Sequence, residues 1–226
     1  MKLSKETIEV LKNFSGINQS IVVNKGNKLK TDNSLKNILA HAQVEEDFPK
    51  EFAIYDLTEF LGLISTMEDP DLSFNDSDVT VSSGSRKVKY RYADTDYIVK
   101  PEKDIEMPES EIKFRLNQDV YVNLDKTATI LQLNDIYLKG CDKSNKMFLC
   151  ATNKKNDSSN DYSEEVGEGV PKKFNVVMKK ENLKIVPGDY DVAISSQGIS
   201  HFKNVNSDLE YWIALEPTSK YGNGGV

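Results

Sequence analysis

Apolar residues recur at helical spacing in two segments of the first half of the chain and alternate with polar residues in several others. Residues 4–14 place their apolar side chains on one face behind Ser4, a favourable N-cap, and this pattern predicts a helix. Residues 57–67 show the same spacing behind Asp56 and predict a second helix. Strands are predicted over residues 20–23, 28–31, 37–44, 72–74, 79–82 and 86–92.

Residues 100–111 (KPEKDIEMPESE) interrupt this pattern. The stretch contains two prolines and many charged residues, and its apolar positions follow no period. We interpret it as an extended connector between a first domain, residues 1–99, and a second domain, residues 112–226.

The second half repeats the order of elements found in the first. Helices are predicted over 119–131 and 180–186, residues 153–172 predict a hairpin arm, and the tail from residue 217 is expected to be frayed. Strands are predicted over residues 112–116, 135–139, 146–152, 173–178, 190–196, 200–205 and 210–215. The predicted fold class is α+β, with two similar domains that each combine antiparallel β-sheets with two helices.

The charge of the chain limits its partners. The 226 residues carry a formal net charge of −7, and the sequence pI is about 5.0. A domain that binds a single DNA site is normally basic, so either DNA is not the partner or the positive charge is confined to one surface. No apolar run approaches the ~20 residues that span a bilayer, and we expect no membrane partner.

Catalytic motifs are missing from the sequence, so we expect no enzyme, no cofactor and no metal site. Both histidines, His41 and His201, fall inside predicted strands. Acidic clusters at 45–47, 68–71 and 164–165 could hold a metal in a nuclease, but they fall at predicted turns, where solvated carboxylates are the usual explanation.

Lysines lie on three of the four predicted helices, opposite or beside the apolar face. In an acidic chain this distribution favours a shared surface that faces phosphates, although each helix alone could simply carry a solvated face. The helix at 57–67 has no basic residue. Lys87, Lys89 and Arg91 alternate along one strand, and we interpret them as guards of an exposed strand edge at a subunit boundary.

Four blocks of the sequence resemble the sliding clamps of T-even-type bacteriophages. They are MKLSKETIEVLKNFSGIN at 1–18, FAIYDLTEFLGLIS at 52–65, NVVMKKENLKIVPGDYDVAI at 175–194 and YWIALEPTS at 211–219. The blocks cover both halves in the right order. The stretch between about 68 and 170 departs from the family.

The resemblance implies a homotrimeric ring in which helices line a hole around double-stranded DNA and sheets form the outer wall. It implies tethering of the replicative DNA polymerase, loading by a clamp loader ATPase, coactivation of late transcription through late-transcription factors, and a place in the cytoplasm of the infected bacterial host. Lys2, Lys5, Lys12, Lys126, Lys179, Lys180 and Lys184 are then expected at the DNA-facing surface.

In this family, partner peptides dock near the connector. The residues expected to bind them are Val99, Ile105, Met107 and Pro108, although Ile105 and Met107 could equally anchor the linker. Two other functions fit the same sequence. One is a non-enzymatic, β-rich structural or assembly protein of a virus, and the other is a metal-dependent nuclease built on the carboxylate clusters.

Overall fold

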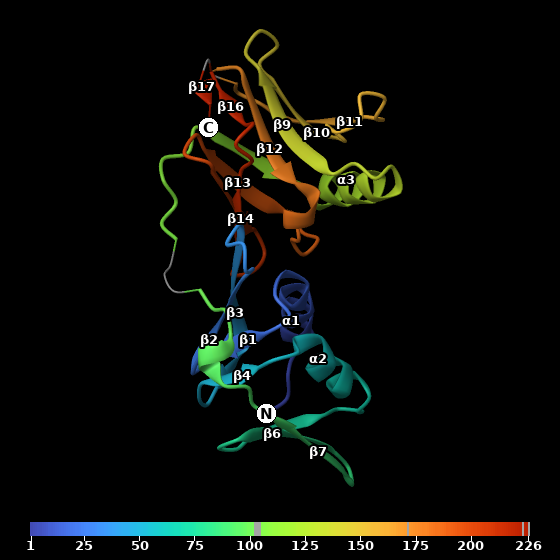
Figure 1. The fold of residues 1–226 in the computed structure, drawn as a ribbon, viewed down its shortest axis with the longest axis vertical. Coiled ribbons are helices and arrows are strands. Elements are labelled where there is room, and N and C mark those ends of the chain that lie inside the picture. Colours follow the sequence, from blue (N-terminus) through green and yellow to red (C-terminus); the bar gives the residue numbers. More distant parts are fainter. Residues whose placement is uncertain (102–104, 171, 223, 226) are drawn as a thin grey trace. The chain divides into compact units, whose positions relative to one another are not determined.

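The computed structural model describes residues 1–101, 105–170, 172–222 and 224–225, and it divides the chain into two compact units, Met1–Asp104 and Ile105–Val226 (Figure 1). Residues 102–104 of the predicted connector lie outside the described residues. The predicted domain boundaries stay a prediction, and we describe each unit by itself.

Unit 1, Met1–Asp104, contains two α-helices and a short 3₁₀ helix in its described part. The helices are α1 (Lys5–Ile17), α2 (Leu57–Ser65) and η1 (Thr95–Tyr97). The strands are β1 (Ile21–Val23), β2 (Gly26–Asp32), β3 (Ile38–Phe48), β4 (Phe52–Ile54), β5 (Asp71–Phe74), β6 (Asp78–Ser83) and β7 (Arg86–Arg91). Antiparallel ladders join β1 to β4, β2 to β3, and β5 to β6 to β7.

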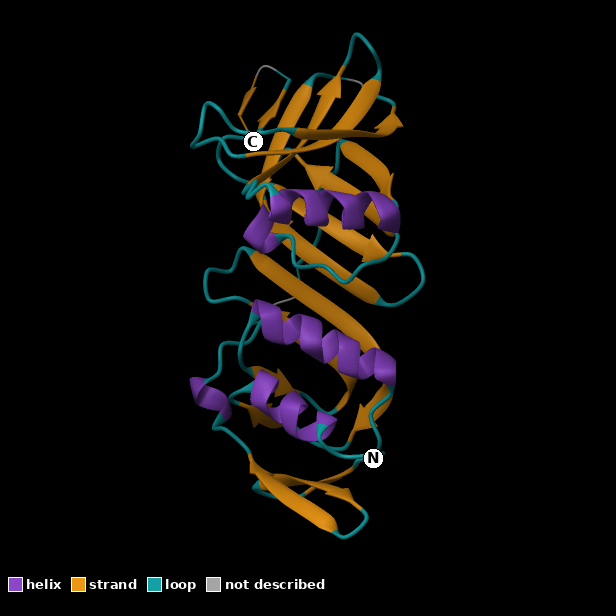
Figure 2. Cartoon of the chain, turned by 90° about the vertical axis from the view of Figure 1, so that its right-hand side faces the viewer, coloured by secondary structure: helices purple, strands orange, loops and turns teal. Residues whose placement is uncertain are grey.

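The two helices of unit 1 lie side by side on one face of its strands (Figure 2). Each helix buries one stripe at helical spacing, which for α1 includes the fully buried Phe14 and ends at Ile17, and for α2 includes Phe60. Asp56 caps α2 by accepting a hydrogen bond from the Glu59 amide, as its sequence position predicts. The sequence does not predict strand β4, because β4 is a fully buried run of three residues and is too short to show a period.

Unit 2, Ile105–Val226, is richer in strands and has one α-helix in its described part. The helices are α3 (Gln118–Ile130) and the 3₁₀ turn η2 (Lys180–Asn182). The strands are β8 (Ile112–Leu116), β9 (Asp135–Cys141), β10 (Lys146–Thr152), β11 (Tyr162–Glu168), β12 (Phe174–Lys179), β13 (Tyr190–Ser195), β14 (Ile199–Asn204), β15 (Leu209–Ala214), β16 (Lys220–Tyr221) and β17 (Gly224–Gly225). Antiparallel pairing gives the orders β11-β10-β9-β12-β16-β17 and β15-β14-β13-β8.

The α+β class and the antiparallel sheets are confirmed, but the helix predicted over 180–186 is wrong. Only η2 forms there, and the chain then runs on with Leu183 and Ile185 buried and Lys184 exposed between them. The β-branched residues and the proline that follow disfavour a helix. Side chains replace the missing helical hydrogen bonds, because the Tyr121 hydroxyl donates to the carbonyls of Leu183 and Ile185.

The predicted hairpin arm and the predicted frayed tail of unit 2 differ in how well they match the structure. The predicted hairpin arm contains β11, which pairs with β10. The tail from residue 217, expected to be frayed, is instead held against the sheet, since Lys220–Tyr221 pairs with β12. The Ser219 hydroxyl accepts a hydrogen bond from the buried Val177 amide, and the Tyr221 ring stacks on Phe174. These contacts explain the error, because none of them can be inferred from local sequence.

Candidate nucleic-acid interface

Helix α1 presents basic side chains on the face opposite its buried stripe. Lys5 and Lys12 are exposed and make no ion pair with any described residue. Lys2, just before the helix, pairs with Asp69 in the loop after α2. All three lysines line the rim of one groove between α1 and α2, so the structure brings together the three basic residues predicted in this part of the chain.

The direction of α1 is fixed by a buried carboxylate from a distant strand. Glu46 of β3 accepts hydrogen bonds from the Ser4 amide and the Thr7 hydroxyl, while the Ser4 hydroxyl accepts from the Thr7 amide. Burial raises the pKa of Glu46, but these hydrogen bonds outweigh burial and hold the pKa below its usual value. A negative charge at the helix N-terminus is also favoured by the helix dipole.

Helix α3 carries the basic residue predicted on it at its exposed face. Lys126 is exposed, and the opposite face buries Tyr121, Leu124 and Ala128. Lys126 makes no ion pair with any residue that the structure describes, so its charge is available to solvent or to a ligand. Helix α2 of unit 1 carries no basic residue.

Lys179, the last residue of β12, and Lys180, which follows it, each form an ion pair. The Lys179 ammonium lies 2.5 Å from the carboxylate of Asp135, a residue that is only 2% exposed, and Lys180 lies 2.9 Å from Asp125 of α3. Hydrogen bonding to Asp135 raises the pKa of Lys179. Burial raises the pKa of Asp135, but the hydrogen bonds from Lys179 and the Lys154 amide outweigh it and lower the pKa.

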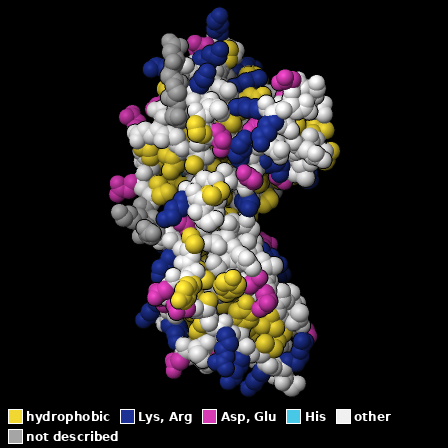
Figure 3. Space-filling model, in the orientation of Figure 1, with side chains coloured by type: hydrophobic (Ala, Val, Ile, Leu, Met, Phe, Trp, Pro, Cys, Tyr) yellow, Lys and Arg dark blue, Asp and Glu magenta, His cyan; other side chains and the backbone are white. Residues whose placement is uncertain are grey.

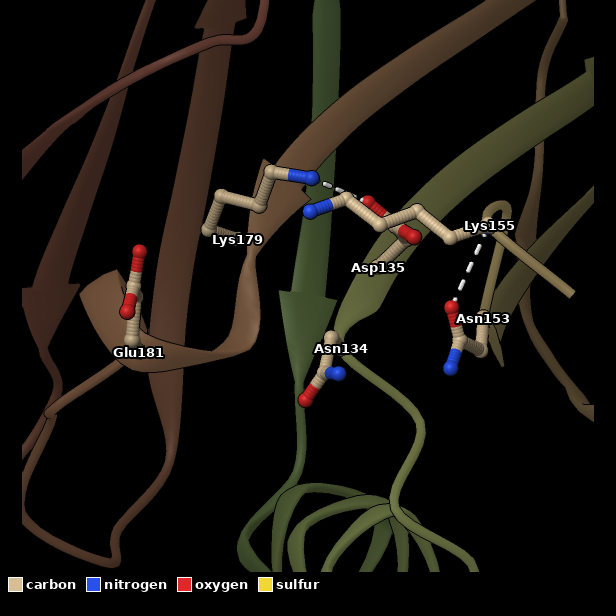
Figure 4. A pocket seen from close by; sticks show the side chains of 6 residues that line it. All are labelled: Asn134, Asp135, Asn153, Lys155, Lys179 and Glu181. Atoms are coloured by element: carbon tan, nitrogen blue, oxygen red, sulfur yellow. Dashed lines mark hydrogen bonds and ion pairs between the residues drawn. The ribbon is translucent and has the colours of Figure 1, made fainter.

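Figure 4 shows the polar pocket beside this ion pair. Its volume is about 270 Å³, and it is lined by Asn134, Asp135, Asn153, Lys155, Lys179 and Glu181. The lining holds two ammonium groups and two carboxylates, which offset each other. The pocket therefore offers no net charge to a phosphate, and Lys179 is an internal partner of Asp135 more than a DNA ligand.

The predicted peptide-binding residues fall on both units. Val99 is exposed in unit 1, and its carbonyl accepts a hydrogen bond from Asn18. Ile105 is exposed in unit 2, and Met107 and Pro108 are half-buried. A common docking groove made by these four side chains stays a prediction.

Two strands at the edges of sheets carry opposite charges. β7 (RKVKYR) is an edge strand, as predicted from its alternating bases, and dark blue side chains mark it in Figure 3. β11 (YSEEVGE) is the edge strand of the six-stranded sheet in unit 2. In the described part of the chain neither strand has a hydrogen-bonded neighbour on its outer side. β11 lies within the predicted hairpin arm, and its glutamates include the acidic cluster at 164–165.

Within the described ranges, no three side chains of His, Cys, Asp or Glu gather where they could hold a metal ion. His201 lies on β14, where its ring stacks on Trp212 and its Nε2 lies 2.8 Å from Glu210. None of the helices in these ranges is long and apolar enough to cross a membrane.

Comparison with known proteins identifies the class to which this fold and these basic helices belong. A family described as DNA polymerase processivity factor matches residues 4–100, and one described as gp45 sliding clamp, C terminal, matches residues 109–217. The sliding clamp of Vibrio phage KVP40 is 35% identical and covers 96% of this chain and 99% of its own. That of Escherichia phage RB69 is 29% identical, covering 98% and 99%. The chain belongs to the sliding clamp family of DNA polymerase processivity factors, which confirms the resemblance seen in the sequence.

Solved structures of more distant proteins show the same fold. The proliferating cellular nuclear antigen of Entamoeba histolytica has a TM-score of 0.66 at 13% identity and covers 93% of this chain and 94% of its own. The PCNA of A. fulgidus, solved with the C-terminal region of FEN-1 bound, has a TM-score of 0.70 at 13% identity, covering 95% and 96%. The fold is therefore shared well beyond bacteriophages.

Proposed function

We propose that three copies of this chain close into a ring around duplex DNA and tether the replicative DNA polymerase for processive synthesis. Family membership supports this function, and the observation that carries it is the placement of exposed lysines on helices of an acidic chain. Lys5, Lys12 and Lys126 present their charge to solvent, although the net charge of the chain is −7. A ring acts by enclosing DNA and requires no cofactor or catalysis.

Weak, sequence-independent attraction suits such a ring. Each phosphate contact adds affinity and salt dependence, and many tight contacts would slow movement along the duplex. A few lysines across a hydrated gap attract the duplex without fixing a register, and acidic residues elsewhere repel DNA from other surfaces. The ion pairs of Lys179 and Lys180 reduce the attraction further.

The two charged edge strands support a head-to-tail homotrimer. A basic β7 of one copy can pair with an acidic β11 of the next, which covers two exposed sheet edges and brings opposite charges together. Because β7 and β11 lie in different units, the contact is heterologous, repeats from copy to copy, and closes a ring when the rotation allows it. Val88, 38% exposed in the middle of β7, adds apolar area to this contact.

The partners of the ring follow from the same proposal. A clamp loader ATPase opens and places it, and the loaded ring also serves late-transcription factors as a coactivator, in the cytoplasm of the infected bacterial host. Partner peptides dock with one or two large apolar side chains on Val99, Ile105, Met107 and Pro108. The bound C-terminal region of FEN-1 in the A. fulgidus PCNA structure supports a peptide mode for these partners.

Light scattering with negative-stain imaging of the same peak tests the assembly. We expect a mass near three times 25.5 kDa and annular particles. A compact monomer at high concentration would overturn the ring. Primer extension on a circular template tests the function, since a loader-dependent gain in processivity separates a clamp from a trimeric structural protein of a virus.

A triple variant, Lys5→Glu with Lys12→Glu and Lys184→Glu, tests the DNA-facing assignment. We expect a lower loading rate because the reversed charges repel phosphates, with an unchanged trimer mass. An unchanged loading rate would defeat the assignment. Lys25→Glu with Lys28→Glu, two exposed lysines outside the assigned surface, is the control for charge reversal as such.

A further inference from the structure

The groove between α1 and α2 combines a basic rim with an apolar floor. Its volume is about 350 Å³, within the range of roughly 300–1,000 Å³ that ligand pockets occupy. Seven of its lining residues are apolar, and the floor includes the buried Leu61, Ile64 and Met67 of α2 and its following turn. Ile8 of α1 lies half-buried on the other wall.

The charge on the rim has a defined spacing. Lys2 is already paired with Asp69, so Lys5 and Lys12 supply the remaining positive charge, with Glu9 between them. Seven residues of an α-helix correspond to roughly 10 Å along its axis. The rim therefore offers two ammonium groups roughly 10 Å apart, and Glu9 disfavours a third carboxylate between them.

Duplex DNA can contact only the charged rim of this groove. Its phosphates can approach Lys5 and Lys12, but a phosphate backbone has no apolar group that could fill the space over Ile64 and Met67. A peptide can do both, because large apolar side chains can enter the groove while flanking carboxylates reach the lysines.

We propose that this groove binds an acidic segment of a partner protein in which two carboxylates flank one or two large apolar side chains. In a segment with polyproline II conformation the carboxylates stand three residues apart, since three residues complete one turn, point to the same side and span roughly 9 Å. The order acidic, apolar, apolar, acidic fits the order Lys5, Ile8, Lys12 along α1 and leaves Glu9 without an acidic neighbour.

Occupation of the groove uses the lysines that the proposed function assigns to DNA. A bound acidic segment and a duplex therefore exclude each other at this surface, a consequence that rests on the proposed function. The peptide site itself rests only on the groove and its charges. A partner with such a segment would engage the ring before DNA enters it or after DNA leaves it.

The test uses the full chain with ¹³C-labelled isoleucine methyl groups, because Ile8 and Ile64 line the groove. The probe is the capped peptide Ser-Glu-Leu-Phe-Glu-Ser, titrated to about 1 mM. We expect the methyl signals of Ile8 and Ile64 to shift and that of Ile130, on α3, to stay in place. Absence of any shift of the groove signals overturns the proposal.

Matched controls separate charge from apolar contact. The peptide with both Glu replaced by Gln and the variant Lys5→Gln with Lys12→Gln should each reduce the shift at least fivefold. Lys25→Gln with Lys28→Gln, exposed lysines outside the groove, should leave it unchanged. Equal shifts with the Gln peptide overturn the acidic partner.

A parallel assay of clamp retention on circular DNA keeps the two proposals apart. Retention without peptide binding refutes the groove site alone. Peptide binding to a chain that never encloses DNA refutes the proposed function and leaves the groove site standing.

Discussion

Two lysine-bearing segments that look alike in the sequence are built differently in the two units. In α1, Lys5 and Lys12 stand on the exposed face of a regular helix without a carboxylate partner in the described residues. At the C-terminal end of β12, Lys179 and Lys180 pair with the carboxylates of Asp135 and Asp125, which come from β9 and α3. The number of lysines in a segment therefore does not give the charge that a ligand meets. Distant acidic residues decide that charge.

Removal of Asp135, the partner of Lys179, should destabilise the chain more than any other substitution below. Asp135→Ala leaves the Lys179 ammonium and the Lys154 amide without their acceptor at the start of β9. We expect the free energy of unfolding to fall by about 3 kcal/mol, measured by urea denaturation. Asp208→Ala, an exposed residue, is the control and should change the midpoint little. Equal midpoints for both variants would show that the ion pair adds nothing.

A smaller loss is expected when the N-terminus of α1 loses its buried anion. Glu46→Gln removes the negative charge that accepts from the Ser4 amide and the Thr7 hydroxyl, and we expect a loss of about 1–2 kcal/mol in the free energy of unfolding. Glu45→Gln, at the exposed neighbouring position, serves as the control. A stronger effect from the Glu45 variant would contradict the assigned capping role.

Glu46 also makes the stability of unit 1 depend on pH, and the direction follows from its pKa. Because the pKa of Glu46 lies below its usual value of 4.5 in the folded chain, its stabilisation is complete above about pH 4.5. This stabilisation is lost as the pH falls through the lower pKa that Glu46 has in the folded chain. Urea midpoints measured from pH 6 to about pH 3 should fall less steeply for Glu46→Gln than for the parent chain.

Loss of one hydroxyl in unit 2 should cost still less. Tyr121→Phe leaves the carbonyls of Leu183 and Ile185 without their shared donor, and about 1 kcal/mol of stability should be lost. The segment would stay extended, since its apolar residues remain buried. Far-ultraviolet circular dichroism checks this expectation, because a gain of helix would show that the tyrosine alone prevents one.

The smallest change in stability is expected when Lys180 loses its carboxylate partner and so resembles Lys5 and Lys12 of α1. Asp125→Asn removes the carboxylate that pairs with Lys180 on an exposed part of α3. We expect little change in the urea midpoint but longer retention on circular DNA at moderate salt, because one more ammonium faces the phosphates. Unchanged retention would place Lys180 away from the DNA.

The sequence predicted α1, α2 and α3 well because each begins at a polar cap and buries a stripe at helical spacing. It failed at 180–186, where lysines and apolar residues imitate such a stripe. There the decisive partners, Tyr121 and Tyr211, lie far away in sequence and supply the hydrogen bonds that a helix would have made. Local patterns cannot report hydrogen bonds of that kind.

The candidate site also has features that the sequence predicts and features that it does not. The exposed lysines of α1 and α3 could be predicted, since each stands opposite a buried stripe. The ion pairs of Lys179 and Lys180 could not, because the pairing of β12 with β9 sets the first and the position of α3 sets the second. The apolar floor of the α1–α2 groove was also hidden, since it forms only where two helices separated by some forty residues lie side by side. The acidic edge of β11 could have been noticed from its clustered glutamates.

The tyrosines around residues 183–186 have a consequence for motion. The Val186 amide donates to the hydroxyl of Tyr211, and the Val186 carbonyl accepts from Tyr190, two rings in the core of unit 2. Irregular chain usually opens on its own and exchanges its amide hydrogens quickly. Here the Val186 amide is bound to a ring of the core, so we expect it to exchange only as fast as the strands that carry those rings separate. A stretch without regular secondary structure thus shares the lifetime of the sheet beneath it.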